Sequence, residues 1–203
     1  MTSQYDQELD AILEYWFGSL DASEYPKDNS VLWWKKKAEV DATIAKRFSI
    51  TLSRSKEGFL DDWRHSPKGR LAHIILVDQM SRNMHRDTGQ MFAQDDLAQE
   101  LSLLCLASGE QYAYYHERLF QYMPLMHAEN RAMQRLCTHL FTTEATQAKT
   151  DAIRKAASGN ARFARRHQNI IERFGRFPHR NELLGRVSTP EELEFLKQPG
   201  SRF

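Results

Sequence analysis

Apolar residues recur along most of the chain at spacings of three and four, the period of a helix with one buried face. Nearly all of the nine glycines and six prolines fall between these patterns, and no alternating run bounded by hairpin dipeptides occurs. The sequence therefore predicts an all-α fold. Many helices with short connections favour antiparallel helix pairs, arranged as a bundle or as a solenoid.

Several helix boundaries are predicted from residues that start or stop helices. Gly18 ends the first amphipathic stripe, and Ser66 with Pro67 caps and begins the most apolar helix. Thr189 opens a capping box for a short last helix. Residues 20–27 are expected to form a loop. The other patterns predict a short helix capped by Ser30, a longer one after it, and helices over residues 87–108, 112–123, 127–141 and 145–174.

Length, charge and cysteine content reduce the number of functional classes to which the protein can belong. The 203 residues suit one domain, with two small lobes as the alternative. The 28 Lys and Arg against 27 Asp and Glu give a formal charge of +1. This balance disfavours binding of nucleic acid or membrane by bulk charge. Cys105 and Cys137 form no CxxC pair, which favours a reduced setting. No segment resembles a signal peptide or a membrane span. We expect a single helical domain, residues 1–203, that is soluble and cytoplasmic.

One helical stripe changes from apolar to charged. The stripe that begins with Leu71 continues at the same spacing to Asp78 and Arg82. An aspartate that faces a core has to be paired, and Arg82 lies one turn further on. Two interpretations stay open: a structural ion pair that closes the helix end, or an Asp78 that orients Arg82 while Arg82 or Arg86 faces a ligand.

A second cluster of polar residues follows Pro124. We expect Pro124 to rigidify the entry to the next helix and to place His127 and Glu129 in or before its first turn, where backbone N–H groups favour anions. Glu129 also fits a plain acid at a helix N-terminus. His167 lies on the apolar face of the long C-terminal helix, where a histidine is more often a core residue than a ligand.

A third cluster lies near the C-terminus, where cationic and aromatic side chains alternate over Arg173–Asn181. Gly175 allows a turn and Pro178 fixes the backbone. Arg176 and Arg180 are candidates for binding a carboxylate or a phosphate, because the donors of a guanidinium form a fixed fork.

The candidate residues do not indicate a metal or RNA site. The histidines of these clusters lack the short ligand spacing that marks a metal site, so we predict no metal and no cofactor. The near-neutral charge disfavours an RNA-binding surface.

Motifs along nearly the full chain resemble a mostly bacterial family known as domain of unknown function 924. The block of most unusual type runs from His167 through Gly175–Asn181 to Leu184–Arg186. The others are Tyr15–Gly18, Trp33-Trp34, Gly58–Trp63, Leu71–Arg86, Phe92–Asp95, Phe120–Glu129 and Thr189–Glu192. The resemblance implies antiparallel helix pairs in a tetratricopeptide-repeat-like right-handed superhelix with degenerate repeats, and it supplies no established activity.

The leading hypothesis is a composite pocket that binds a small anionic or polar ligand. Arg176 and Arg180 would bind the anion, and the candidates for proton transfer are His127, His179 and Glu129. The nine residues of this pocket are Asp78, Arg82, Arg86, His127, Glu129, His167, Arg176, His179 and Arg180.

Two alternatives from other classes stay open. A tetratricopeptide-type scaffold would bind a protein partner through an exposed aromatic groove. An enzyme would use His/Glu acid–base chemistry on a phosphate- or carboxylate-bearing metabolite, and its pocket histidines would have strongly shifted pKa values. The sequence carries no signal of an oligomeric state. The residues expected in the aromatic groove are Tyr112, Tyr114, Tyr115 and Trp33 or Trp34.

Overall fold

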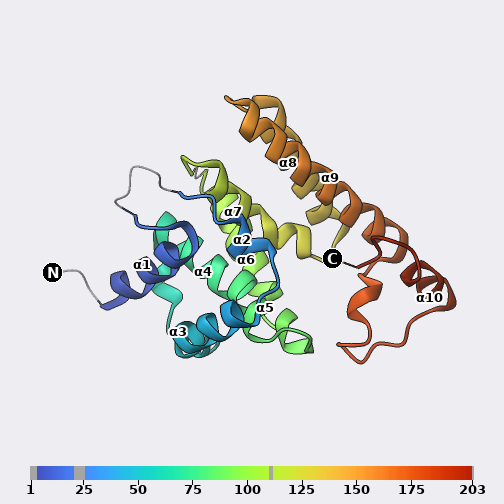
Figure 1. The fold of residues 1–203 in the computed structure, drawn as a ribbon, viewed down its shortest axis with the longest axis horizontal. Helices are drawn as coiled ribbons and strands as arrows, with labels where there is room; N and C mark the ends of the chain where they lie inside the picture. Colours follow the sequence, from blue (N-terminus) through green and yellow to red (C-terminus); the bar gives the residue numbers. More distant parts are fainter. Residues whose placement is uncertain (1–3, 21–25, 110–111, 203) are drawn as a thin grey trace. The chain divides into compact units, whose positions relative to one another are not determined.

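The computed structural model describes residues 4–20, 26–109 and 112–202 (Figure 1). All regular secondary structure within these ranges is helical, which confirms the all-α prediction. The predicted loop at 20–27 lies largely outside the described residues. The α-helices are α1 (Gln4–Phe17), α2 (Ser30–Trp34), α3 (Ala38–Lys56), α4 (Pro67–Ile74), α5 (Ser81–Met84), α6 (Asp95–Ala107), α7 (Tyr115–His127), α8 (Arg131–Gln147), α9 (Asp151–Phe174) and α10 (Pro190–Leu196).

Four further helices, of other types, complete the described helical structure. Three are 3₁₀-helices and one is a π-helix that joins α4 to α5. They are η1 (Asp61–His65), η3 (Gly89–Phe92), η4 (Pro178–Arg180) and the π-helix η2 (Ile75–Met80).

Two of the predicted helix starts are confirmed in atomic detail. The Ser66 hydroxyl accepts the N–H of Gly69 at 3.0 Å, and Pro67 is the first residue of α4. At α10 the Thr189 hydroxyl accepts the N–H of Glu192 at 3.2 Å, while the Glu192 carboxylate accepts the N–H of Thr189 at 2.7 Å. This reciprocal pair is a capping box.

Other predicted boundaries were wrong. The helix expected from Asp87 begins at Asp95, because Asp87 has a φ of 61°, in the left-handed region that breaks a helix. Pro124 lies inside α7, which continues to His127. Burial of the surrounding apolar side chains, such as Phe120 and Leu125, offsets the lost backbone hydrogen bond. Similarly, α8 starts later and ends later than predicted, and α9 starts later than predicted, at Asp151.

The described chain divides into two compact units. The single domain predicted over residues 1–203 stays a prediction. The first unit comprises Met1–Arg86 and Gln90–Pro124, and the second comprises Asp87–Gly89 and Leu125–Phe203.

The core of the first unit contains an aromatic cluster and a buried π-helix. The ring of Phe120 lies 5.4 Å from that of Trp16 and 5.7 Å from that of Phe17, both in edge-on orientation. Every residue of η2 is buried. The π-helical turn therefore carries the polar Asp78 and Gln79 into the interior, where their side chains need partners.

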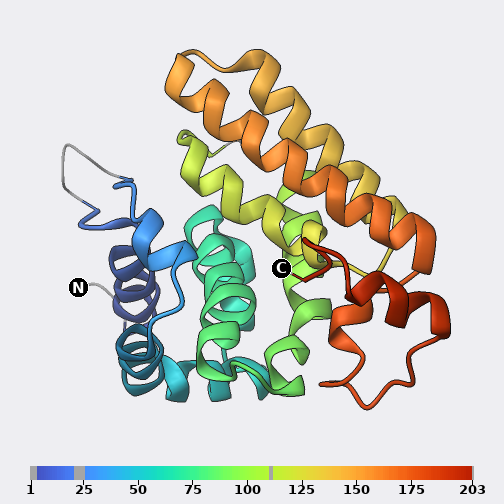
Figure 2. The same cartoon turned by 45° about the vertical axis from the view of Figure 1, so that its right-hand side comes forward.

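The second unit is built on α8 and α9, which lie side by side in both views (Figures 1 and 2). The beginning of α8 meets the end of α9, where Arg135 Nε donates to Glu172 Oε1 at 2.8 Å. Beyond α9 the chain turns and buries Phe177 against Ile170 and Ile171. That turn brings the predicted Arg173–Asn181 cluster back onto the end of α9.

Gly175 makes this turn with a φ of 71°, so replacing it with alanine should destabilise the protein. We expect Gly175→Ala to lower the free energy of unfolding by about 1 kcal/mol, because a Cβ disfavours the left-handed conformation. Gly159, within α9, is the matched control. There Gly→Ala should raise stability by about 0.5–1 kcal/mol, since the nearest atom to the new Cβ is 4.0 Å away on a flexible side chain. Urea unfolding checks both, and the same sign for the two variants would contradict this account.

Candidate functional site

In the first unit, Asp78 and Arg82 form the predicted ion pair. Arg82 Nη1 donates to Asp78 Oδ1 at 2.9 Å, and Arg82 Nη2 donates to Asp95 Oδ1 at 2.8 Å. Gln79 Nε2 donates to the other oxygen of Asp78. The Asp78 side chain is only 1% exposed. Arg82 therefore lies between two carboxylates of low exposure.

Arg86 is also held by a carboxylate of the first unit. Its Nε and Nη2 donate to the two oxygens of Asp41 at 2.6 and 2.8 Å, and Asn83 Nδ2 donates to the same carboxylate at 2.7 Å. The hydrogen bonds from Arg86 hold the pKa of Asp41 below its usual range. This bidentate pair occupies the face of Arg86 that a planar anion would use.

In the second unit, Glu129 lies in the connection between α7 and α8. Its two oxygens accept Nη1 and Nη2 of Arg186 at 2.6 and 2.9 Å, and Oε1 also accepts the backbone N–H of Phe177 at 2.7 Å. Glu129 precedes Asn130, whose side chain caps α8. The carboxylate thus joins this connection to the segment after α9.

Phe177 is the residue around which three predicted site residues gather. Its ring is fully buried, with His167 at 5.5 Å and His179 at 5.6 Å between ring centroids. The guanidinium carbon of Arg180 lies 4.7 Å from the Phe177 centroid, within range of a cation–π contact. Arg180 Nη2 also donates to the carbonyl oxygen of His127 at 2.9 Å. The second unit therefore brings His127, His167, His179 and Arg180 together.

His167 resists protonation. Burial, with smaller contributions from His127, His179 and Arg180, lowers the pKa of His167 to about 3. His167 Nδ1 donates to the Phe163 carbonyl at 2.8 Å, which opposes the shift and fixes the tautomer of the neutral ring. His167 thus has the burial and the hydrogen bond of a satisfied core histidine, and its role in binding a ligand stays a prediction.

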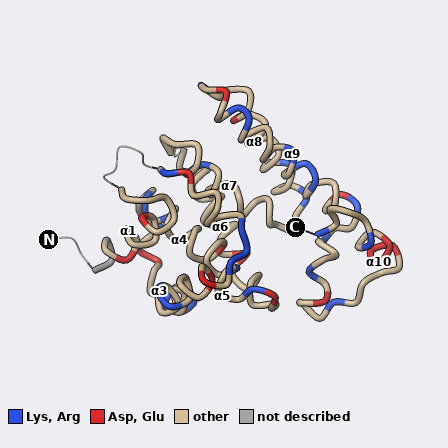
Figure 3. The backbone as a smooth tube through the Cα atoms, viewed as in Figure 1, with Lys and Arg blue, Asp and Glu red and all other residues tan. Residues whose placement is uncertain are grey.

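Arg176 is engaged by the capping box of α10. Its Nε and Nη2 donate to the two oxygens of Glu192 at 2.6 and 2.8 Å, and Nη2 also donates to the Val187 carbonyl at 2.9 Å. Figure 3 shows the setting of this pair, with basic positions along α9 and acidic positions on α10. The same Glu192 carboxylate thus caps a helix and binds a guanidinium.

A pocket of about 540 Å³ opens beside His179 in the second unit. Three cationic side chains and a single acidic one line it, together with a serine hydroxyl and apolar groups. The lining residues are Pro178, His179, Glu182, Arg186, Ser188, Leu193, Leu196, Lys197 and Arg202.

The sequence reasoning missed several of the residues that define these sites. Asp95 and Asp41 are distant in the chain from the arginines they bind, and Lys197 and Arg202 belong to no motif. Arg186 closed the C-terminal motif but was not included among the nine candidates. Only Asp95 had a signal in the sequence, because it lies in the first turn of α6 and could have been considered as a partner for Arg82.

The nine predicted residues fall into both units. Asp78, Arg82 and Arg86 belong to the first and the other six to the second, so their grouping in one site stays a prediction. Within the described ranges, no group of three or more His, Cys, Asp and Glu side chains is placed to hold a metal ion. Among the helices of the same ranges, none has the length and the apolarity that a membrane span requires.

These features define an all-helical protein in which arginine–carboxylate pairs organise both units. The chain belongs to a family described as bacterial protein of unknown function (DUF924), whose model matches residues 12–200. A solved structure of a protein of unknown function, ATU0120 from Agrobacterium tumefaciens, is 31% identical and superposes with a TM-score of 0.75. That match covers 93% of this chain and 96% of the other. No curated protein matches the chain.

Removing the charge of Asp78 should destabilise the protein. We expect Asp78→Asn to lower the free energy of unfolding by about 3 kcal/mol, because Arg82 loses one of two partners in a site of low exposure. The control is Glu194→Ala, whose partner Lys197 is 71% exposed, and a change within about 0.5 kcal/mol is expected there. Urea unfolding followed by circular dichroism measures the free energy of unfolding of both variants. If Asp78→Asn lowers it as little as the control does, the Asp78–Arg82 pair contributes little to stability.

The Arg176–Glu192 pair should stabilise the protein at neutral pH and lose this effect in acid. Hydrogen bonding to Arg176 lowers the pKa of Glu192 from 4.5 to about 2. The stabilisation is therefore full above about pH 5 and is lost as the pH falls toward 2. We expect the pair to contribute about 2 kcal/mol to the free energy of unfolding at neutral pH, because solvent around the part-exposed Arg176 weakens the interaction. Urea unfolding between pH 7 and 2 should show a smaller loss for Glu192→Gln than for the wild type. Glu191→Gln, in an exposed pair with Arg173, should follow the wild type. Parallel curves for Glu192→Gln and the wild type would rule out this role.

Proposed function

We propose that the second unit binds a small anionic or polar ligand in the pocket beside His179. The observation that carries the proposal is the convergence of three cationic side chains on a pocket with one acid, Glu182. The volume of about 540 Å³ suits a metabolite-sized molecule. Glu129 neutralises much of the charge of Arg186, and Lys197 pairs with Glu194, so Arg202 is the main cation of this pocket without a described carboxylate partner.

The electrostatics of His179 support an anionic ligand. Burial, with smaller contributions from the charges of Arg180, Arg202 and Arg186, lowers the pKa of His179 to about 4, and Glu129 opposes this shift. The imidazole is therefore neutral at pH 7, so one nitrogen can donate a hydrogen bond and the other can accept one. The same cations that disfavour a proton on His179 favour an anion in the pocket.

Both alternative functions have less support. A histidine with a pKa of about 4 is a weak base at pH 7, and Glu129 is bound by Arg186, so His/Glu acid–base catalysis has no matched pair here. For the scaffold, Tyr112 and Tyr115 are buried and leave mainly Tyr114 and Trp34 exposed. The tetratricopeptide-like superhelix of antiparallel pairs and the cytoplasmic location stay predictions.

Differential scanning fluorimetry against phosphate- and carboxylate-bearing metabolites tests this proposal. A ligand should raise the unfolding temperature of the wild type, since binding to the folded state stabilises it. Isothermal titration calorimetry with the best hit should then show about tenfold weaker binding to Arg202→Gln, which loses a charge-assisted hydrogen bond. Arg202 is exposed, so this variant should fold normally.

Arg162→Gln is the matched control, because Arg162 is an exposed arginine of α9 that does not line the pocket. It should bind the hit as the wild type does. A panel without any stabilising anion, or equal affinity of wild type and Arg202→Gln, would overturn the proposal.

A further inference from the structure

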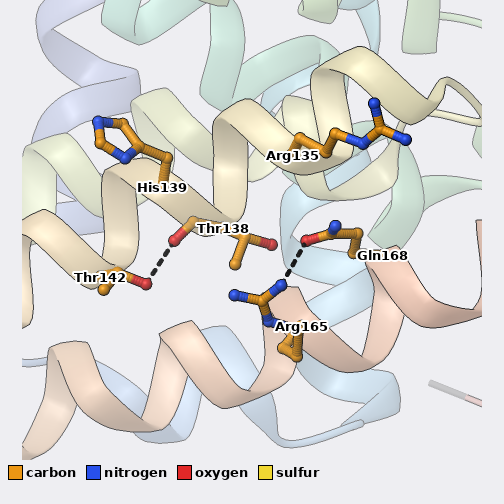
Figure 4. A pocket seen from close by; sticks show the side chains of 6 residues that line it. All are labelled: Arg135, Thr138, His139, Thr142, Arg165 and Gln168. Atoms are coloured by element: carbon orange, nitrogen blue, oxygen red, sulfur yellow. Dashed lines mark hydrogen bonds between the residues drawn. The ribbon is translucent and has the colours of Figure 1, made fainter.

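A second pocket of the second unit lies in the groove between α8 and α9, and side chains of both helices line it (Figure 4). It has a volume of about 280 Å³, and no acidic side chain lines it. The two pockets share no lining residue. The groove is lined by Arg135, Thr138, His139, Thr142, Arg165 and Gln168.

Thr138 supplies a buried donor in this groove. Its side chain is 4% exposed, and its hydroxyl oxygen has no hydrogen-bond partner in the structure. In Figure 4 this side chain extends from α8 toward the space that Arg165 and Gln168 of α9 enter. A buried hydroxyl without a partner is uncommon, because its hydrogen bonds to water are lost without replacement. A ligand in the groove would supply the missing partner.

Arg165 supplies a charge that no described carboxylate neutralises. Its Nη1 donates to Gln168 Oε1 at 3.3 Å, a long hydrogen bond to a neutral group, and this uses one of five N–H donors. Arg135 differs, because its Nε donates to Glu172 at 2.8 Å. Arg165 is therefore the main source of positive charge in the groove.

We propose that this groove binds a tetrahedral oxyanion of the phosphate class, with the Thr138 hydroxyl and the Arg165 guanidinium donating to the same anion. The fork of Arg165 matches two oxygens of a phosphoryl group, and a third oxygen can accept from Thr138. The Thr142 hydroxyl is already committed, since it donates to the Thr138 carbonyl at 2.7 Å. The pocket is large enough for a phosphoryl group and open enough for the rest of an ester to extend into solvent.

Amide NMR spectra of the full chain test the proposal directly. Inorganic phosphate and methyl phosphate, titrated separately, should each shift signals around Thr138 and Arg165 in a saturable way. Arg165→Gln should weaken the affinity about tenfold, because a positive charge and its forked donors are lost, and Thr138→Val about threefold, because a single uncharged donor is lost. Thr138→Val removes a hydroxyl that has no partner, so its unfolding temperature should stay the same or rise.

Two exposed arginines serve as controls. Arg162→Gln, on α9 outside the groove, and Arg202→Gln, in the pocket beside His179, should keep wild-type affinity at this site. Saturation by methyl phosphate as well as by inorganic phosphate would assign the site to phosphate esters, and saturation by inorganic phosphate alone would assign it to the free ion. The proposal is overturned by the absence of saturable shifts near Thr138, or by unchanged affinity in both Arg165→Gln and Thr138→Val.

Discussion

The second unit depends on the carboxylate of Glu129. Burial alone would raise the pKa of Glu129, but hydrogen bonds from Arg186 and from the Phe177 N–H hold it below its ordinary value. Desolvating a carboxylate and a guanidinium is costly unless both are fully hydrogen-bonded. Here one oxygen accepts from Arg186 and from the Phe177 backbone, and the other accepts from Arg186 again. Because these contacts come from distant parts of the chain, the connection before α8 and the segment after α9 are fixed together.

Fixing the backbone at Phe177 also determines the positions of its neighbours. The Phe177 ring fills the core beside Ile170 and Ile171, and Arg180 and His179 lie against it. A binding pocket gains affinity when its groups are already ordered before the ligand arrives. The buried Phe177 therefore links the Glu129 carboxylate to the geometry of the pocket wall, through His179.

The sequence predicted those features whose chemistry is local. Ser66 and Thr189 act within their own first turns, and Gly175 acts through its own φ angle, so composition and spacing were sufficient. Asp87 in the left-handed region and Pro124 inside α7 depend on packing by residues far away, which a single sequence does not show. Distance along the chain likewise decides which ion pairs could be predicted. Asp78 and Arg82 lie one helical turn apart, so their pairing was predicted, whereas Asp41–Arg86 and Glu129–Arg186 join distant segments and were not predicted.

The arginines of this chain consequently have two kinds of setting, in ion pairs with carboxylates or in the lining of a pocket. The chain has nearly equal numbers of acids and bases, and folding places Arg82, Arg86 and Arg176 against carboxylates of low exposure. A ligand that displaced one of these guanidinium groups would leave a carboxylate unpaired, which is costly. The cations that we propose for anion binding, Arg165 and Arg202, line pockets and form no ion pair with a described acid. A motif rich in arginine identifies the region of a site, whereas the distribution of carboxylates in the fold determines which arginines remain available to a ligand.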